Sequence, residues 1–137
     1  MSLIRGPAPI THILDEERPR LINGKEPANQ GEARVATALD QLNHRYIYQF
    51  QLIDIKGVRG AFRIDFLVLT TTPLSTPLEV FGEYWYSGRM GQEDQFRIAQ
   101  IEAHFRGRAQ RVVIVFGSEI QNQEMTDDII RQKIGAA

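Results

Sequence analysis

Two acidic residues lie inside stretches of the chain that are otherwise apolar. Asp65 falls within FRIDFLVL at 62–69, and Glu79 falls within LEVF at 78–81. Both stretches have the β-branched and aromatic content of strands, and the Pro/Thr-rich segment 70–77 between them is typical of a turn. An ionised carboxylate in a mostly buried strand is unfavourable unless it is paired, hydrogen-bonded or bound to a metal. The fold must therefore supply a partner for each acid.

Strand periodicity places the two acids where they can meet. Side chains alternate between the faces of a strand, so Asp65 shares a face with Arg63, and Glu79 shares a face with Phe81. If the strands pair antiparallel about the 70–77 loop, both acids project to the same side. Two neighbouring carboxylates repel, and a divalent cation removes that repulsion. This pattern predicts a metal site, and the alternatives are a surface acid on an edge strand or an ion pair with Arg63.

A third acid lies on the inward stripe of the first predicted helix, residues 29–43. Asn29 is a candidate N-cap, and the composition favours a helix. Glu32 lies in register with the apolar stripe. Either it joins a buried site, or it only stabilises the helix N-terminus through the helix dipole. The apolar stripe consists of Val35, Ala36, Leu39 and Leu42.

The remaining segments predict one α/β domain. A strand is expected at 46–53 and helices at 92–106 and 124–134, and the apolar run 111–116 is typical of a strand covered on both faces. The resulting order, αβββαβα, gives a mixed central β-sheet flanked by helices. The proline-containing residues 1–28 are predicted to form an irregular N-terminal arm, and 29–137 the domain.

The helix at 92–106 has two distinct sides. Its apolar side is predicted to face the sheet, and its basic side to face solvent. The apolar side comprises Phe96, Ile98, Ala99, Ile101 and Phe105. The basic side comprises Arg97, His104 and, just beyond the helix, Arg108.

Composition excludes several classes of function. The chain of 137 residues contains no cysteine, so disulfide scaffolds, cysteine zinc sites and thiol nucleophiles are ruled out. A net charge of −1 argues against nonspecific coating of nucleic acid. No apolar run has the length of a membrane span, and the first residues do not resemble a signal peptide, so we expect no membrane partner and a cytoplasmic location. The serine-hydrolase and P-loop motifs are also missing.

Three acids in this order carry a resemblance to a known family. Glu32 lies in GEARVATAL, Asp65 in RIDFLV and Glu79 in LEVFG, followed by GEYW at 82–85. Over roughly residues 29–134 the chain resembles the PD-(D/E)XK nuclease superfamily, and GEYW is similar to the strand ending of phage-type and very-short-patch-repair-like members. The resemblance implies a restriction-endonuclease-like fold and metal-dependent hydrolysis of phosphodiester bonds in DNA.

The resemblance also assigns roles to individual residues. It implies that Asp65 and Glu79 are catalytic and bind Mg²⁺ or Mn²⁺, with the backbone carbonyl of Val80 completing the site. Glu32 is implied as the third catalytic acid, binding the metal directly or through water. Carboxylate oxygens suit these hard cations.

The chain departs from the family pattern two residues after the third-strand acid. The family has Lys, Gln or another polar residue there, whereas this chain has Phe81, which cannot orient a water or stabilise developing charge. The histidine that ends the family motif is replaced by Tyr86. Three alternatives stay open: the metals act alone, catalysis has been lost, or a polar group from elsewhere takes over. The candidates for that group are Glu83, Arg89, Gln95 and Arg97.

DNA is the predicted partner, and four basic residues are candidates to contact its phosphates. They are Arg89, Arg97, His104 and Arg108. For each arginine the alternative is a solvated helix face. Aromatic residues at 84–86 are candidates to stack on a splayed base, with core packing as the alternative.

Two functions compete for this sequence. The first is a metal-dependent DNA endonuclease of a phage, mobile element or repair system. The second is a catalytically inactive nuclease-fold module that binds nucleic acid, or assembles a larger complex or homo-oligomer through the arm at 1–28. An unrelated α/β interaction domain with salt-bridged acids is a third.

Overall fold

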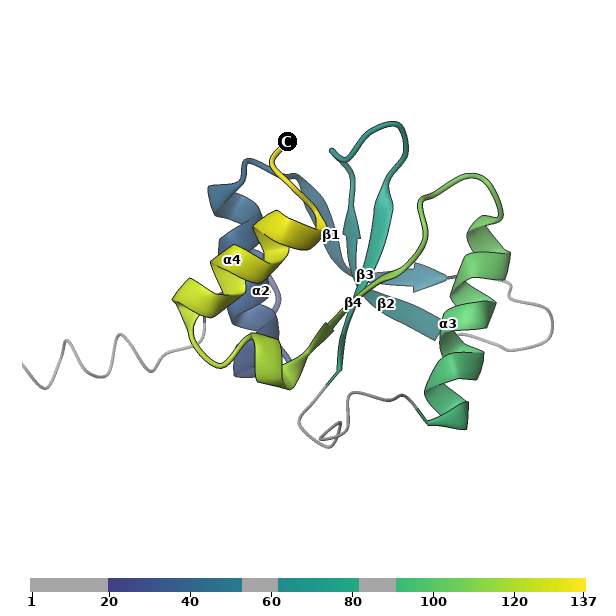
Figure 1. Cartoon of the computed structure of the whole chain (residues 1–137), viewed down its shortest axis with the longest axis horizontal. Helices are drawn as coiled ribbons and strands as arrows, with labels where there is room; N and C mark the ends of the chain where they lie inside the picture. The colour runs from purple at the N-terminus through teal and green to yellow at the C-terminus, as the bar shows by residue number, and fades with distance from the viewer. Residues whose placement is uncertain (1–19, 53–61, 82–90) are drawn as a thin grey trace, which may run out of the picture.

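The computed structural model of the chain describes residues 20–52, 62–81 and 91–137. These residues form an α/β structure with a four-stranded mixed sheet and helices on both sides, as predicted for the general class (Figure 1). The elements in chain order are α2 (Gln30–Gln41), β1 (Tyr46–Leu52), β2 (Phe62–Val68), β3 (Thr76–Phe81), α3 (Gln92–Phe105), β4 (Val113–Phe116), the 3₁₀ turn η1 (Gly117–Glu119) and α4 (Gln123–Lys133). None of the helices in these ranges combines the length and apolar character needed to cross a membrane.

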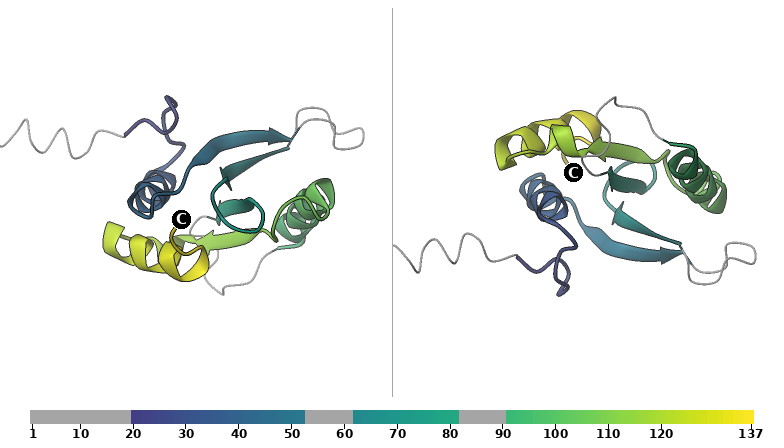
Figure 2. Two further views of the ribbon diagram at one scale, coloured as in Figure 1. Left: turned by 90° about the horizontal axis from the view of Figure 1, so that it is seen from above. Right: turned by 90° about the horizontal axis from the view of Figure 1, so that it is seen from below.

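The sheet follows the chain in the order β1-β2-β3-β4. The first two pairings are antiparallel, whereas β4 runs parallel to β3 after the connection through α3. Parallel neighbours need such a crossover, which explains why a helix separates these two strands. Helices α2 and α4 lie together on one side of the sheet and α3 lies on the other, as both views in Figure 2 show.

Each side of the sheet has its own apolar core. Because side chains alternate along a strand, Phe66 and Leu78 pack towards α2 and α4, whereas Leu67 packs towards α3. The larger cluster also contains Val35 and Leu39 from the predicted stripe of α2. The same alternation places Glu79, which lies between Leu78 and Val80 of the larger cluster, on the side of α3.

The segment before α2 protects the outer edge of β1. Asn23 Oδ1 accepts a hydrogen bond of 2.7 Å from the backbone N–H of Tyr48, and Lys25 Nζ donates to the carbonyl of Tyr48 at 3.4 Å. Ile22 is fully buried in the larger core. A covered edge does not offer unpaired backbone groups to other chains. Within the predicted arm at 1–28, the described part therefore packs on the domain, while residues 1–19 lie outside the described ranges.

Two predictions about burial are wrong. Phe96, predicted on the apolar side of α3, is 61% exposed, and Ile101 is the buried residue of that helix. The N-terminal half of α3 lies next to polar groups of the sheet, so Phe96 has no apolar surface there to pack against. The run 111–116 forms a shorter strand at the edge of the described sheet, where Val115 alone is buried. An edge strand has only one neighbour, which explains its lower burial.

Strand β1 is interrupted at one residue. Tyr48 pairs with Phe66 and Phe50 pairs with Ile64, but Gln49 between them has φ of 56° and does not pair with Asp65. A left-handed backbone at a residue with a β-carbon costs about 1–2 kcal/mol. The position opposite Asp65 is therefore strained, which is typical of functional sites.

We expect Gln49→Gly to raise the free energy of unfolding by about 0.5–1 kcal/mol, because glycine adopts positive φ without a steric penalty. Gln51→Gly is the matched control: Gln51 is exposed in the regular part of the same strand and pairs with Arg63. There, glycine should lower stability by a similar amount. Urea denaturation of both variants measures the change in the free energy of unfolding. Equal destabilisation by the two substitutions would contradict the inference that the backbone of Gln49 is strained.

Candidate active site at the fork between β2 and β3

The β2–β3 ladder stops at the level of the two strand acids. Backbone pairing ends with Phe66 and Leu78, and beyond this pair the two strands separate (Figure 1). The N–H of Asp65 donates to Glu79 Oε2 at 2.7 Å, and the N–H of Val80 donates to Asp65 Oδ2 at 2.7 Å. Each carboxylate thus takes the place of a backbone carbonyl on the opposite strand. This arrangement forms a fork whose two arms are joined by acidic side chains.

The predicted antiparallel pairing and the meeting of the two acids are confirmed. The alternative of an edge strand is wrong for Asp65, because β2 lies between β1 and β3. The alternative of an ion pair with Arg63 is also wrong, since the described residues contain no ion pair between these two side chains. Arg63 is exposed.

Burial makes ionisation of the fork acids unfavourable. Burial, followed by the nearby charges of Glu79 and Glu32, raises the pKa of Asp65 to about 8. The Val80 N–H and the charge of Arg97 act in the opposite direction but do not offset burial. The pKa of Glu79, whose side chain is 2% exposed, is also raised, mainly by burial and against the lowering effect of Arg97. Carboxyl groups with raised pKa values in one place are typical of functional sites.

The third predicted acid belongs to the same electrostatic cluster. Glu32 is buried in the first turn of α2, where Asn29 Oδ1 accepts its backbone N–H at 2.8 Å. Tyr48 donates a short hydrogen bond to Glu32 Oε1, and burial together with this bond raises the pKa of the tyrosine to about 12. The charge of Glu32 raises the pKa values of both Asp65 and Glu79. The burial of Glu32 agrees with its predicted position on the inward, apolar stripe of α2.

One arginine contacts the fork from α3. Arg97 Nε donates to Glu79 Oε1 at 2.8 Å, and its Nη2 donates to the carbonyl of Arg63. The arginine is 28% exposed and its glutamate partner 2%. The sequence placed Arg97 on the solvent face of the helix, which is wrong: this part of α3 lies over the fork, so the guanidinium faces buried carboxylates. A cation within this distance offsets part of the negative charge.

The side chain of Phe81 is buried and packs against an aromatic residue of β4. Its side chain is 5% exposed, and its ring lies 6.2 Å from the ring of Phe116. The position that is polar in the family is therefore filled by an aromatic core contact. Of the candidate replacements, Arg97 reaches a fork carboxylate, whereas Glu83 and Arg89 lie outside the described residues.

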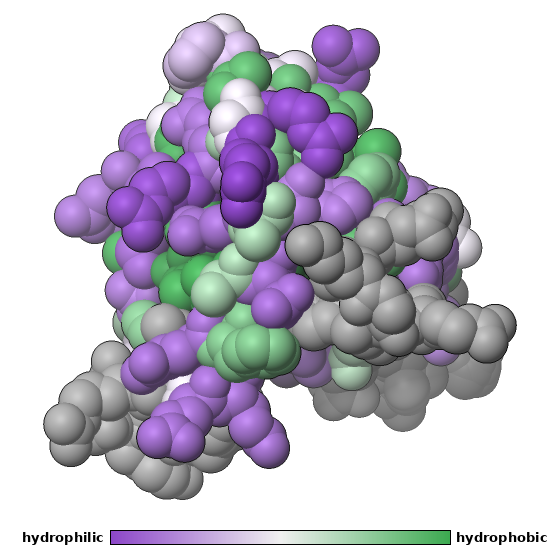
Figure 3. All heavy atoms as spheres, turned by 90° about the vertical axis from the view of Figure 1, so that its right-hand side faces the viewer, coloured by the Kyte–Doolittle hydropathy of each residue, from purple (hydrophilic) through white to green (hydrophobic). Residues whose placement is uncertain are grey.

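The other predicted DNA contacts lie away from the fork. His104 is at the opposite end of α3 from Gly91, seven residues or about 10 Å along the helix from Arg97. Arg108 Nη2 donates to the carbonyl of His104 at 2.5 Å, closing the end of α3. The side of the molecule that carries this helix is largely hydrophilic, with hydrophobic residues scattered among the polar ones (Figure 3). Arg89 and the aromatic residues 84–86 lie outside the described residues.

The sequence did not predict a role in the site for two residues that contact Glu32. Tyr48 was assigned only to a strand, and Asn29 only to a helix cap, yet both hold Glu32 in place. A signal for Tyr48 existed, because a tyrosine on the inward face of a strand needs a hydrogen-bond partner for its hydroxyl. No comparable signal distinguishes Asn29 from an ordinary N-cap.

The residues at the fork fit a divalent cation through two carboxylates. Among the residues that the structure describes, no group of three or more His, Cys, Asp and Glu side chains is arranged to hold a metal ion. Mg²⁺, however, is commonly bound by one or two carboxylates, with water and substrate phosphate completing its shell. Asp65 Oδ1 accepts no hydrogen bond from a described residue, although the other oxygen of this carboxylate is bonded. This free oxygen, beside Glu79, is the ligand that such an ion would use.

Comparisons of the chain with models of protein families, with curated proteins and with solved structures found no match.

Proposed function

We propose that the chain is a metal-dependent DNA endonuclease domain of the PD-(D/E)XK type, with a restriction-endonuclease-like fold. One observation carries the proposal: Asp65 and Glu79 bridge the two arms of the fork and have raised pKa values. Two such acids destabilise a metal-free protein near neutral pH, so a structural role alone does not account for them. Their order along the chain, together with buried Glu32, supports this family over other nucleases.

The fork residues have separate tasks in this function. Asp65 and Glu79 hold the cation, Mg²⁺ or Mn²⁺, with Val80 contributing its carbonyl and Glu32 acting directly or through water. When bound, the ion supplies positive charge beside the scissile phosphate and lowers the pKa of a water. Tyr48 and Asn29 fix the Glu32 carboxylate through hydrogen bonds. Because these carboxylates are already held in position, the site does not need to rearrange during the reaction, and this lowers the activation free energy.

Arg97 takes over the cationic role for which Phe81 is unsuited. It reaches Glu79 from α3 rather than from β3, through the bond that its guanidinium Nε donates. In this position it stabilises negative charge that develops on a phosphate held at the fork. The proposal therefore assigns catalytic charge stabilisation, rather than distant phosphate contact, to this arginine.

A second function is favoured by the same ion pair. If Arg97 permanently neutralises Glu79, the domain is a catalytically inactive nuclease-fold module that binds nucleic acid within a larger complex. The aromatic packing of Phe81 agrees with this alternative. Oligomerisation through the N-terminal arm and a cytoplasmic location remain predictions.

We expect the purified chain to nick or cut DNA in Mg²⁺ or Mn²⁺ and to be inactive in EDTA. Supercoiled plasmid and single-stranded oligonucleotides serve as substrates, and Glu79→Gln should lower the rate by at least about 10²-fold. Glu124→Gln, an exposed change in the first turn of α4, is the control and should leave the rate unchanged. Cleavage that survives Glu79→Gln would refute this site. DNA binding without cleavage would support the inactive module.

A further inference from the structure

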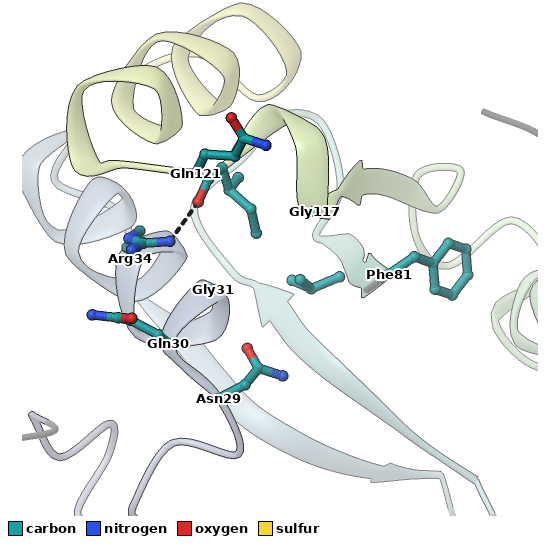
Figure 4. A pocket seen from close by; sticks show the side chains of 9 residues that line it. Asn29, Gln30, Gly31, Arg34, Phe81, Gly117 and Gln121 are labelled. Carbon is teal, nitrogen blue, oxygen red and sulfur yellow. Dashed lines mark hydrogen bonds between the residues drawn. The ribbon is translucent and has the colours of Figure 1, made fainter. Parts of the chain in front are cut away.

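A cavity of about 570 Å³ opens beside the fork on the side of α2. Figure 4 shows its walls: the start of α2 on one side, the end of β3 on another and the segment after β4 above. A volume of this size accommodates a small organic ligand. The three walls come from segments that are distant in the sequence. No single sequence motif could therefore predict the cavity.

The cavity is joined to the fork by two residues. Val80 lines the cavity and donates its backbone N–H to Asp65. Asn29 also lines the cavity, and its amide Nδ2 donates to Glu32 Oε2 at 3.4 Å. A group bound in the cavity therefore contacts Val80, the neighbour of Glu79 in β3, and Asn29, which bonds Glu32.

The cavity presents hydrogen-bond donors without a negative charge. Arg34 is half-buried and uses Nη1 to donate to the carbonyl of Ile120 at 2.8 Å, while its other N–H groups make no hydrogen bond to a described residue. Gln121, which Figure 4 shows above Arg34 on the segment after β4, is exposed and has no hydrogen bond within the described part of the chain. No carboxylate is found among the described residues that line the cavity, and Val80 and Ile120 supply apolar surface.

This combination suits one part of a nucleic acid. A guanidinium and amide groups match the acceptor edge of a nucleobase, and the apolar residues match its faces and the sugar. The side chain of Phe81 points away from the cavity, so recognition through hydrogen bonds, rather than aromatic stacking, is expected (Figure 4). A cationic ligand is disfavoured by Arg34.

From these contacts we infer that the cavity binds the nucleoside unit that adjoins the phosphate at the fork. The inference rests on the proposed function and specifies how the substrate is held: one nucleotide leaves the stack and enters the cavity. Unstacking is easiest in single strands, at ends and at mismatches. The substrate is accordingly a DNA with an unpaired nucleotide at the site of cleavage.

Binding of mononucleotides tests the inference separately from cleavage. The full-length Asp65→Asn variant in EDTA is titrated with each deoxynucleoside monophosphate and, separately, with inorganic phosphate, and methyl resonances are followed by NMR. We expect at least one nucleotide to shift the resonances of Val80 and Ile120, with a dissociation constant of about 1 mM. Phosphate alone should leave them in place. No shift up to about 10 mM nucleotide, or equal shifts with phosphate, would overturn the inference.

Variants of the cavity locate the binding. Arg34→Gln and Gln121→Leu should each weaken nucleotide binding at least about threefold, since each removes hydrogen-bonding groups from the wall. Arg111→Gln removes the same charge from a side chain that is 91% exposed at the other end of β4, and should leave binding unchanged. Because Gln121 is exposed, its replacement tests the inference even if Arg34→Gln fails to fold. Unchanged binding in Gln121→Leu and in a folded Arg34→Gln would overturn the inference.

Failure of the inference and failure of the proposed function are distinguishable. Metal-dependent cleavage without nucleotide shifts overturns the nucleoside cavity and leaves the endonuclease intact. Nucleotide shifts without cleavage support the cavity in an inactive, nucleic-acid-binding module.

Discussion

Asp65→Asn is expected to abolish metal-dependent DNA cleavage and, in the same protein, to raise the melting temperature of the metal-free domain at pH 8. Asparagine has nearly the shape of aspartate and keeps an oxygen for the N–H of Val80. It removes the negative charge that burial, Glu79 and Glu32 oppose. Loss of a cation ligand should lower the cleavage rate by at least about 10²-fold.

The gain in stability should depend on pH in a defined direction. The pKa of Asp65 is about 8 in the folded protein, above its ordinary value, so the folded state holds this proton more tightly than the unfolded state. Its contribution to stability is therefore fully present below about pH 4 and is lost as the pH rises through 8. Asparagine carries no such proton. The variant should be about as stable as the parent at pH 4 and more stable than the parent at pH 8.

Thermal melts in EDTA across this pH range measure the effect. Asp128→Asn is the matched control, because that carboxylate is 74% exposed and pairs with Arg131 at 3.7 Å on the surface of α4. Its replacement should change stability by less than about 0.5 kcal/mol at any pH. A structural role for Asp65 predicts the opposite result, namely that Asp65→Asn destabilises the domain at pH 8. Such a result would remove the main support for a functional fork.

The sequence predicted the fork acids because strand alternation is a local rule. Knowing that Asp65 and Glu79 lie on consecutive antiparallel strands is enough to place them on one side of a sheet. Helical periodicity similarly placed Glu32 on the buried stripe of α2. These three residues could be predicted without coordinates, since each depends on its own element and a simple pairing.

Arg97 could not be placed in the same way. Periodicity separates the faces of a helix but does not say which part of the sheet lies beneath each turn. The N-terminal half of α3 lies over the carboxylates, so a basic side chain is the one that turns inward and Phe96 remains exposed. The left-handed backbone of Gln49 and the cavity beside Val80 also depend on tertiary contacts. Glutamine carries no propensity signal for that conformation.

Arg97→Met is expected to destabilise the metal-free domain by about 2–4 kcal/mol at pH 8. Glu79 is 2% exposed and its ion pair with Arg97 is closed at 2.8 Å. Removing one partner of a buried ion pair leaves the other charge in a poor environment, and this costs more than the pair itself contributes. Methionine retains most of the apolar contact of the arginine stem, so the loss reports on the charge and on the hydrogen bonds of the guanidinium.

Divalent cations should then restore the stability of Arg97→Met. A cation at the fork takes the place of the guanidinium beside Glu79, and stabilisation by a bound ligand grows with its concentration above the dissociation constant. We expect the melting temperature of the variant to rise more in Mn²⁺ than that of the parent chain, in which Arg97 competes for Glu79. Arg111→Met is the control: its pair with Glu102, 3.5 Å long, is exposed at the arginine and should show neither effect.

The increase in the melting temperature of Arg97→Met in Mn²⁺ decides between the two proposed functions. An endonuclease site must accept a cation next to Glu79, so both proteins should be stabilised by Mn²⁺ and the variant should gain more. In an inactive module, Arg97 is a permanent substitute for the metal, and the fork has no selective reason to retain a cation site. Arg97→Met would then stay destabilised at every Mn²⁺ concentration. Either result is obtained without a DNA substrate, so it does not depend on knowing what the domain cuts.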